Sequence, residues 1–281
     1  MNKNTDLLPV PGVYYNIPNH DYHSWPYVSS TLLKAYDKLP STCRIPFMPG
    51  DDANVGSGVH AFVLEGQKGL GEQCILGPAY GKGKADMAAR EALQAENPGK
   101  VILPAFYGSP APGQPIMDVL NGVNDSLRNH PKIGPVLANS EKEVSLVWID
   151  ECSGLTCKAR LDIWDGQIIW DLKKVRSISG FPFQMKELGY HIQAGFYYEG
   201  AKSCGLEAVA FGFIPVEAFP PYQAACGYVD PDRLEAARAN AKRLVGLVKE
   251  SQLTDVWPNY RIPEHIFSLA DIVPDDLVAV Y

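Results

Sequence analysis

The feature that most constrains the fold of this chain is a run of alternating polar and apolar residues between positions 143 and 173. Residues 143–148 and 157–164 both alternate with the period of two that is typical of a strand with one buried face. Asp165-Gly166 is then a strong signal for a type I′ hairpin turn, and residues 167–173 return as another strand. The run therefore predicts three consecutive antiparallel strands.

The C-terminal part of the chain predicts helices and further strands. A helix is expected over residues 183–202, and two strands are expected over 208–216 and 222–229. Asp230-Pro231 opens an amphipathic helix, because apolar residues recur after it at helical spacing. These residues are Leu234, Ala237, Ala241, Leu244 and Val248. The order of strands, helix, strands and helix predicts an α/β fold with a mixed central β-sheet flanked by helices.

We expect a single domain over residues 1–281, with four regions inside it. Its N-terminal segment contains loops and a short helix that Ser29, Ser30 or Thr31 would cap. A second helix begins near Ser57, and an Ala-rich helix between two loop-like patches predicts a peripheral insertion. The regions are the N-terminal segment at 1–50, the insertion at 77–116, a core at 143–260 and an acidic tail at 261–281.

The composition of the chain limits the functions that are open to it. Hydrophobic residues make up 46% of the chain, which excludes disorder as its main state. The formal net charge is −7, which argues against a protein that coats nucleic acid with a broad basic surface. Residues 156–202 hold seven basic and five acidic side chains, and this stretch alone is locally positive. A focal binding site for nucleic acid is therefore compatible with the acidic chain.

Cysteine usage and hydropathy predict a cytoplasmic protein. Six cysteines are scattered without a CxxC pair, which is typical of free thiols in a reducing cytosol. The longest apolar run, residues 208–216, is too short to cross a bilayer. The first residues also lack the apolar stretch of a secretory signal.

The predicted hairpin places two carboxylates and a lysine on one face. With a two-residue loop at Asp165-Gly166, Asp162 pairs with Ile169. Asp162, Asp171 and Lys173 then share a face, because side chains alternate along a strand and pairing preserves the side. The two acids are diagonal neighbours about 7–8 Å apart at the backbone, so that both can reach one divalent cation. Ordinary solvent-facing charge is the alternative interpretation of this pattern.

Phosphodiester cleavage needs groups of this kind. A hard cation with oxygen ligands holds the scissile phosphate and lowers the pKa of an attacking water. A positive side chain stabilises the negative charge that develops in the transition state. On this hypothesis Asp162 and Asp171 supply ligands, and Lys173 supplies the ammonium group.

Three motifs in order resemble the PD-(D/E)xK nuclease superfamily. Asp162 followed on the next strand by Asp171 and Lys173 resembles the signature of the superfamily. Gly56-Ser57-Gly58-Val59-His60 resembles the GxxxH helix that precedes this core in RecB-type nucleases. Tyr190, Gln193 and Tyr197, on one face of a helix, resemble the QxxxY motif of the same group. Taken singly, His60 and the two tyrosines are equally compatible with core packing.

Across nearly the whole chain, the sequence resembles the RecE-type (exonuclease VIII) phage recombination nucleases. The insertion and the acidic tail lie outside the resemblance. The family usually has Thr where Lys174 stands and often has Pro where Leu161 stands. The segments that resemble the family are Asp21-Tyr22-His23, residues 28–33, 56–65, 158–162, 170–173 and 190–197, and Trp257-Pro258-Asn259-Tyr260.

This resemblance implies a PD-(D/E)xK (restriction-endonuclease-like) domain that acts as a Mg²⁺-dependent exodeoxyribonuclease, with Mn²⁺ as a substitute metal. It implies degradation of linear double-stranded DNA, 5′→3′, to 3′ single strands for recombination. The implied metal ligands are His60, Glu143, Asp162 and Asp171, with Glu141 as the alternative to Glu143. The implied catalytic residues are Asp162, Asp171, Lys173, Gln193 and Tyr197, and those expected to bind DNA are Arg160, Lys174 and Arg176.

The resemblance also implies partners. Members of the group form rings around DNA, so we expect a homo-oligomeric ring of three or four subunits and a single-strand annealing protein as partner. A bacterial host cell and a phage or prophage origin follow from the same resemblance. A ring would reconcile the acidic chain with DNA binding, since only its inner wall need be positive.

Three other functions are compatible with the sequence. A related nuclease of other polarity, or an endonuclease, would share the core. Many such nucleases bind an iron–sulfur cluster through one early and three late cysteines, whereas only Cys204 and Cys226 follow the QxxxY-like helix, so no cluster is expected. A non-catalytic DNA-end-binding or phage assembly protein and an unrelated metal-dependent hydrolase are the other two.

Overall fold

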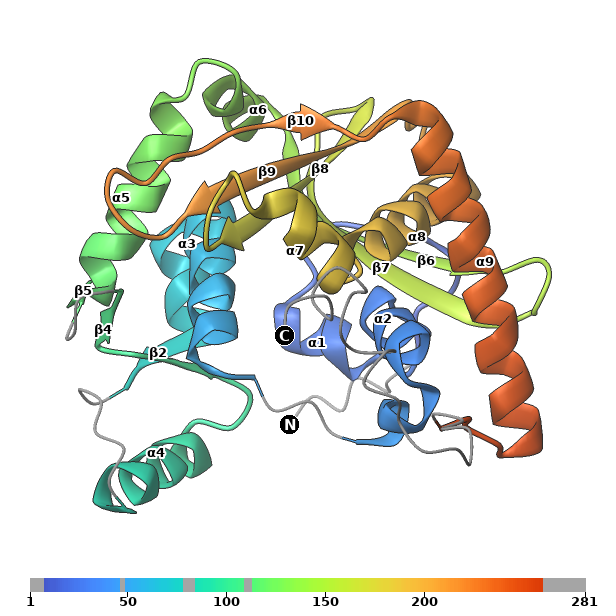
Figure 1. The fold of residues 1–281 in the computed structure, drawn as a ribbon, viewed down its shortest axis with the longest axis horizontal. Helices are drawn as coiled ribbons and strands as arrows, with labels where there is room; N and C mark the ends of the chain where they lie inside the picture. The colour runs from blue at the N-terminus through green and yellow to red at the C-terminus, as the bar shows by residue number, and fades with distance from the viewer. Residues whose placement is uncertain (1–7, 46–48, 78–83, 109–112, 260–281) are drawn as a thin grey trace, which may run out of the picture.

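A six-stranded mixed sheet forms the centre of the molecule in the computed structural model, which describes residues 8–45, 49–77, 84–108 and 113–259 (Figure 1). The strand order is β1-β6-β7-β8-β9-β10. β8 and β9 are parallel and the other neighbours are antiparallel. The strands are β1 Gly12–Tyr14, β6 Glu141–Ile149, β7 Thr156–Trp164, β8 Ile168–Val175, β9 Ala210–Glu217 and β10 Gly227–Tyr228. The expected α/β fold with a mixed sheet is confirmed.

Helices cover both faces of the sheet and bury two separate apolar clusters (Figure 1). α2 Ser30–Lys38, α8 Tyr190–Ser203 and α9 Pro231–Thr254 pack on one face. α3 Asp51–Gln73, α5 Ile116–Asn129 and α6 Ile133–Asn139 pack on the other. The apolar residues predicted for the last helix are all buried in α9, because their spacing gives the helix one apolar stripe. The remaining helices are α1 Asn19–Ser24, the 3₁₀ helix η1 Pro40–Arg44, α4 Lys84–Glu96 and α7 Phe181–Glu187.

The hairpin between β7 and β8 differs in register from the sequence prediction. Trp164 pairs with Ile169, so the loop contains four residues and not two. Asp165 causes the difference: its Oδ1 accepts hydrogen bonds from the backbone N–H of Gln167 (3.0 Å) and Ile168 (2.7 Å), and its Oδ2 accepts one from the Trp170 indole (2.9 Å). A shift of two residues keeps every side chain on its predicted face.

Two other predicted elements are interrupted. The helix expected over 183–202 is divided into α7 and α8 by Gly189, which has a φ of 65°. The strand expected over 222–229 is reduced to β10, because Tyr222 lies in a turn with a φ of 58°. Ala224 forms only an isolated bridge to Val216.

The segment at 77–116 contains an outlying helix and a buried strand. α4 stands apart from the sheet (Figure 1). β3 Val101–Leu103 pairs in parallel with β2 Cys74–Leu76, and Leu103 is fully buried against Gly58. β4 Phe106–Tyr107 pairs with β5 Gln114–Pro115 beside them. The predicted acidic tail and Tyr260 lie outside the described residues. In the described part of the chain, no helix is long and apolar enough to cross a membrane.

Candidate active site

Most of the predicted site residues line a cleft of about 870 Å³ between α1, α2, α3 and residues of β6, β7 and β8. Asp171 and Gln193 are buried beside its wall, and Arg176 lies outside it. Helix α3 brings His60 to it, β6 brings Glu143, and β7 brings Asp162. β8 supplies Lys173, and α8 adds Tyr190 and Tyr197 to the wall. Elements far apart in the sequence therefore build one site.

Three of the predicted metal ligands face one another in this cleft. His60, Glu143 and Asp162 each offer a ligand atom, and these atoms all lie within 4.8 Å of one another. His60 Nδ1 is 3.5 Å from Asp162 Oδ2, which also accepts a hydrogen bond from the Leu172 backbone N–H at 2.8 Å. Glu141, the alternative acid, is exposed and does not line the cleft. Glu143 is therefore the acid that the fold places in the site.

Glu143 has an unusual backbone for a strand residue. Its φ is 54°, in the left-handed region that a side chain with a β-carbon rarely adopts. Its neighbours Lys142 and Val144 pair normally with Ile163 and Leu161, but Glu143 has no partner in the ladder. Backbone strain of this kind costs on the order of 1–3 kcal/mol and is common at functional sites. A regular strand is thus distorted at the residue whose carboxylate faces the other ligands.

Asp171 belongs to a second group beside these three ligands. Its side chain is fully buried, with the Lys173 Nζ 2.5 Å from Oδ2. Gln193 from α8 donates a hydrogen bond to Oδ1 at 2.7 Å. Asp171 is therefore held by Lys173 and Gln193 and is not part of the group of three.

The positive side chains near the buried carboxylates of the site do not fully offset the effect of burial on their pKa values. Burial raises the pKa of Asp171 from 3.8 to about 6, although the Lys173 ammonium opposes the shift. It also raises the pKa values of Glu143 and Asp162, against the attraction of Arg160 and Lys173. Burial and Lys173 lower the pKa of His60 to about 4, which leaves the imidazole neutral with a free lone pair. The carboxylates of Glu143 and Asp162 and the neutral imidazole of His60 suit a divalent cation. A bound cation would supply the positive charge that these carboxylates lack.

Sequence analysis missed one residue of the site, Lys34. It lies on α2, lines the cleft, and donates a hydrogen bond from Nζ to Gln193 Oε1 at 3.3 Å. Burial and the nearby Lys173 lower the pKa of Lys34 to about 8. Gln193 therefore connects Lys34 to Asp171. The signal in the sequence was a single lysine directly after Leu33 in an otherwise apolar helix segment.

Two of the three residues predicted to bind DNA already have partners within the protein. Arg160 lines the cleft but is largely buried, with Nη2 donating to the carbonyl of Ile17 at 2.6 Å and Nε 2.5 Å from Glu143 Oε2, so its predicted contact with DNA stays a prediction. The N-terminal segment packs over this face of β7 and removes Arg160 from solvent. Lys174 lines the cleft but is paired with Asp52 at 2.6 Å, whereas Arg176 is exposed at the end of β8.

An Asp on one strand and an Asp-x-Lys on the next, with a histidine from a preceding helix, define the site of a PD-(D/E)xK protein. The chain belongs to the family described as "PDDEXK-like domain of unknown function (DUF3799)", whose model matches residues 50–265. This membership confirms the superfamily; the resemblance to the RecE-type branch stays a prediction.

A solved structure shares the fold. It is that of a "Putative exonuclease" from Eubacterium rectale, with a TM-score of 0.61 and 15% sequence identity. The alignment covers 93% of this chain and 100% of the other. Among curated proteins, none matches the chain. The likeness extends the restriction-endonuclease-like fold over almost all of the chain.

Proposed function

We propose that this protein is a metal-dependent exodeoxyribonuclease that degrades linear double-stranded DNA from the 5′ end and leaves 3′ single strands for recombination by an annealing protein. The observation that supports this most is that His60, Glu143 and Asp162 line one cleft with Lys173, which is paired with the buried Asp171. The acidic group can hold a cation that contacts the phosphate, and the Lys173 ammonium can stabilise negative charge on it. Such a cleft suits a phosphodiester and not an apolar ligand.

His60, Glu143 and Asp162 would hold the metal, with Asp171 as a further carboxylate beside it. When bound, Mg²⁺ or Mn²⁺ supplies a Lewis acid for the scissile phosphate and lowers the pKa of a bound water. The imidazole of His60 is neutral at physiological pH and is therefore ready to act as a ligand.

Lys173 would act on the charge that develops during cleavage. Although burial opposes it, the attraction of Asp171 and Asp162 raises the pKa of Lys173, so that the side chain stays an ammonium. Its Nζ lies 2.5 Å from Asp171 and 5.0 Å from the centre of the Tyr190 ring, which restrict its movement. A fixed positive charge stabilises a transition state better than a mobile one. Gln193 would position Asp171, and Tyr197 closes the wall of the site.

The experiment is incubation of purified protein with linear and covalently closed circular duplex DNA in Mg²⁺, Mn²⁺ or EDTA. We expect metal-dependent loss of the linear form alone, with a 5′ end label released before a 3′ label. Nicking of circles would indicate an endonuclease, and release of the 3′ label first would reverse the polarity. No cleavage of either DNA, with retention of DNA on a filter, would indicate the non-catalytic end-binding protein instead.

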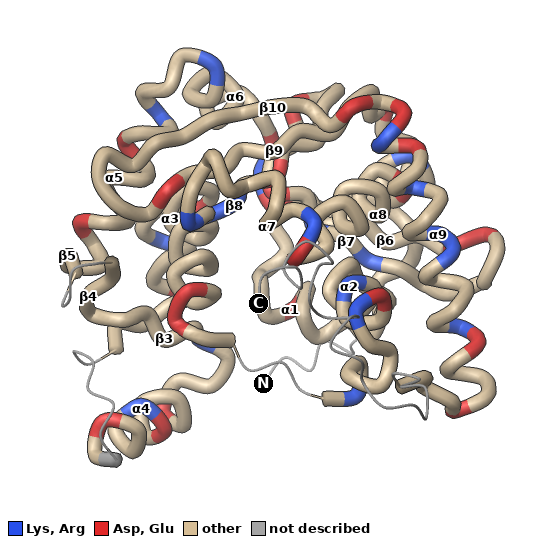
Figure 2. The backbone as a smooth tube through the Cα atoms, viewed as in Figure 1, with Lys and Arg blue, Asp and Glu red and all other residues tan. Residues whose placement is uncertain are grey.

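We also propose a homo-oligomeric ring of three or four subunits. The chain has a formal net charge of −7, and in the view of Figure 2 the Lys and Arg positions are interspersed with Asp and Glu positions along the backbone. A long-lived complex with DNA would then need several subunits around the duplex. Light scattering at micromolar concentration should give three to four times the mass of the chain, and a stable monomer would contradict the ring.

A further inference from the structure

A second cleft of about 660 Å³ adjoins the candidate active site. Asp52 lines both clefts. Lys174, in the wall of the first, donates a hydrogen bond at 2.9 Å to the hydroxyl of Tyr107, in the wall of the second. The second cleft lies between the beginning of α3, β4, the end of β8 and the residues after β9. The two clefts are therefore parts of one continuous surface.

Among the charged side chains that line the second cleft, Arg176 is available to bind an anion. Asp51 is paired with Arg90 at 3.1 Å, and Asp52 is paired with Lys174 at 2.6 Å. Arg176 also lines the cleft, is exposed, and has no hydrogen bond or ion pair with any residue that the structure describes. Both acids thus have another side chain bonded to them. Arg176 attracts Asp52 without a direct ion pair, so its guanidinium N–H groups are open to an anion.

Aromatic side chains line the same cleft as this guanidinium. Phe106 on β4 is 38% exposed, and Phe219, after β9, is 39% exposed. Both line the cleft together with Tyr107. Partly exposed aromatic rings beside an open cation are the combination that binds single-stranded nucleic acid, because bases stack on the rings and phosphates pair with the cation. In a duplex the flat faces of the bases are covered by their neighbours, so only unpaired nucleotides fit.

We propose that this second cleft binds unpaired nucleotides of one DNA strand. These nucleotides lie at the end of the duplex that enters the active site. This inference rests on the proposed nuclease function and adds the path of one strand to it. Arg176 directly follows the end of β8 and is three residues beyond Lys173, which corresponds to about 10 Å of extended chain. That span matches about three stacked nucleotides of a single strand. Phe106 and Phe219 stack with bases, and Arg176 holds a phosphate.

The test measures binding separately from cleavage. Fluorescence anisotropy is recorded with a labelled single strand, a duplex with a 3′ overhang and a blunt duplex, with Ca²⁺ in place of Mg²⁺ and intact DNA confirmed on a gel. The variants are Phe106→Ala, Phe219→Ala and Arg176→Gln. The matched controls are Tyr228→Ala, an exposed aromatic at the edge strand β10, and Arg243→Gln, an exposed arginine on α9.

Each Phe→Ala variant should weaken binding of the single strand and the overhang by about 5- to 150-fold, the range for loss of one stacked base, and should change blunt-duplex binding less than about twofold. Arg176→Gln should weaken the same two ligands and flatten their salt dependence. Both controls should bind as the wild type does. Melting temperatures establish that each variant is folded, and Arg176→Gln alone decides the matter if a Phe→Ala variant is unstable.

Three results would overturn the inference. If the variants bind all three DNAs as the wild type does while the wild type cleaves DNA in Mg²⁺, the cleft is not a DNA site and the nuclease function stands. If the variants lose all three DNAs equally, the cleft binds duplex and not unpaired nucleotides. If the wild type neither binds nor cleaves DNA, the inference and the proposed function fail together.

Discussion

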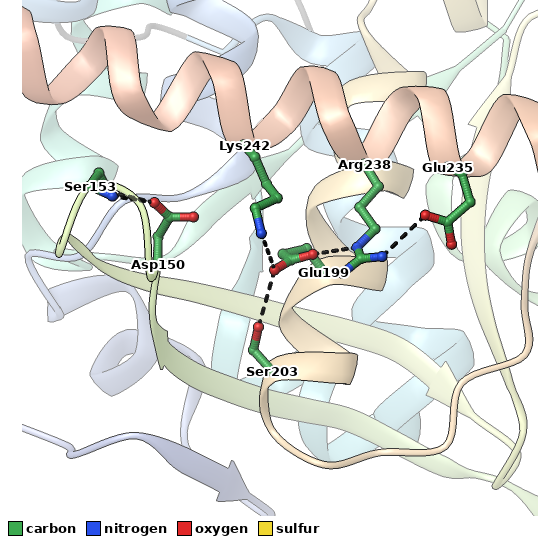
Figure 3. A network of polar contacts seen from close by, with 7 residues as sticks. All are labelled: Asp150, Ser153, Glu199, Ser203, Glu235, Arg238 and Lys242. Atoms are coloured by element: carbon green, nitrogen blue, oxygen red, sulfur yellow. Dashed lines mark hydrogen bonds and ion pairs between the residues drawn. The ribbon is translucent and has the colours of Figure 1, made fainter.

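Helix α8 contributes to two buried polar clusters, and the carboxyl pKa is raised in one of them and lowered in the other. At its beginning Gln193 contacts Asp171 in the cleft. Further along the same helix, Glu199 accepts hydrogen bonds from Arg238, from Lys242 at 3.3 Å and from Ser203 at 3.4 Å (Figure 3). Burial tends to raise the pKa of Glu199, but Arg238 and Lys242 outweigh it and lower the pKa.

The comparison separates a structural carboxylate from a functional one. Glu199 is paired with two cations, Arg238 and Lys242, and so joins α8 to α9 (Figure 3). Arg238 also pairs with Glu235 at 3.1 Å. Asp171 has one lysine, and its pKa is raised to about 6 in spite of it. A buried acid that the protein does not fully neutralise is a candidate for binding a cation or for catalysis. The predictions below test this contrast between the two clusters.

The largest expected effect is that of Asp162→Asn. The amide oxygen can still accept the hydrogen bond from the Leu172 N–H, but the site loses a charged ligand. We expect Mg²⁺-dependent cleavage to fall to roughly a thousandth or less, by analogy with the loss of other strong electrostatic groups. Asp150→Asn is the matched control, because Asp150 is buried, accepts a hydrogen bond from the Ser153 N–H (Figure 3) and does not line the cleft. Full activity of Asp162→Asn would refute the site.

Lys173→Ala should reduce kcat by about 10²-fold with DNA binding nearly unchanged, because its charge is needed most in the transition state. The adjacent Lys174 is already paired with Asp52, and Lys174→Ala should retain at least about half of kcat. Initial rates at saturating DNA, with binding measured separately, test both variants. A larger loss of kcat in Lys174→Ala would reverse the roles of the two lysines.

The pH dependence of metal binding should distinguish the carboxylates of the cleft from Glu199. A raised carboxyl pKa means that Asp171 favours the folded state at low pH, and that this contribution is lost as the pH rises through about 6. Metal binding has the opposite dependence, because the cation requires the deprotonated carboxylates and protons compete with it.

Saturating Mn²⁺ should therefore raise the melting temperature clearly at pH 7.5 and much less at pH 5.5, with apparent affinity falling up to about tenfold per pH unit for each proton displaced. Thermal shift measurements at the two pH values provide the test. Glu199→Gln should keep the metal response and Asp162→Asn should lose it. An equal stabilisation at both pH values would argue against raised carboxyl pKa values in the site.

We expect the smallest effect from a change in the ion-pair network of Glu199, Arg238 and Lys242. Glu199→Gln removes the charge shared by Arg238 and Lys242, which are both about 30% exposed. We expect a loss of about 1–2 kcal/mol in the free energy of unfolding, less than for a fully buried pair because solvent screens the two cations. Urea denaturation gives this value, and kcat should stay unchanged. A large loss of activity at unchanged stability would mean that the network acts on the cleft.

Much of the fold could be predicted from local patterns. The alternation along β6 and β7 and the apolar stripe of α9 appear where the sequence places them, because each depends only on side-chain spacing within one element. The order of Asp162, Asp171 and Lys173, taken with the GxxxH-like and QxxxY-like motifs on either side, predicted the superfamily that the family match confirms. Even the error in the hairpin register was harmless to the site, since a shift of two residues preserves the faces.

Contacts between distant residues decided the rest. Lys34 reaches Gln193 across 159 residues of sequence, and Arg160 is covered by a segment 143 residues before it. No local period records such pairs. The sequence by itself determined which elements form and which acids belong to the signature. Only the tertiary structure decided which charges neutralise one another, because a charge in a buried site is balanced by whichever groups the fold brings within a few ångströms.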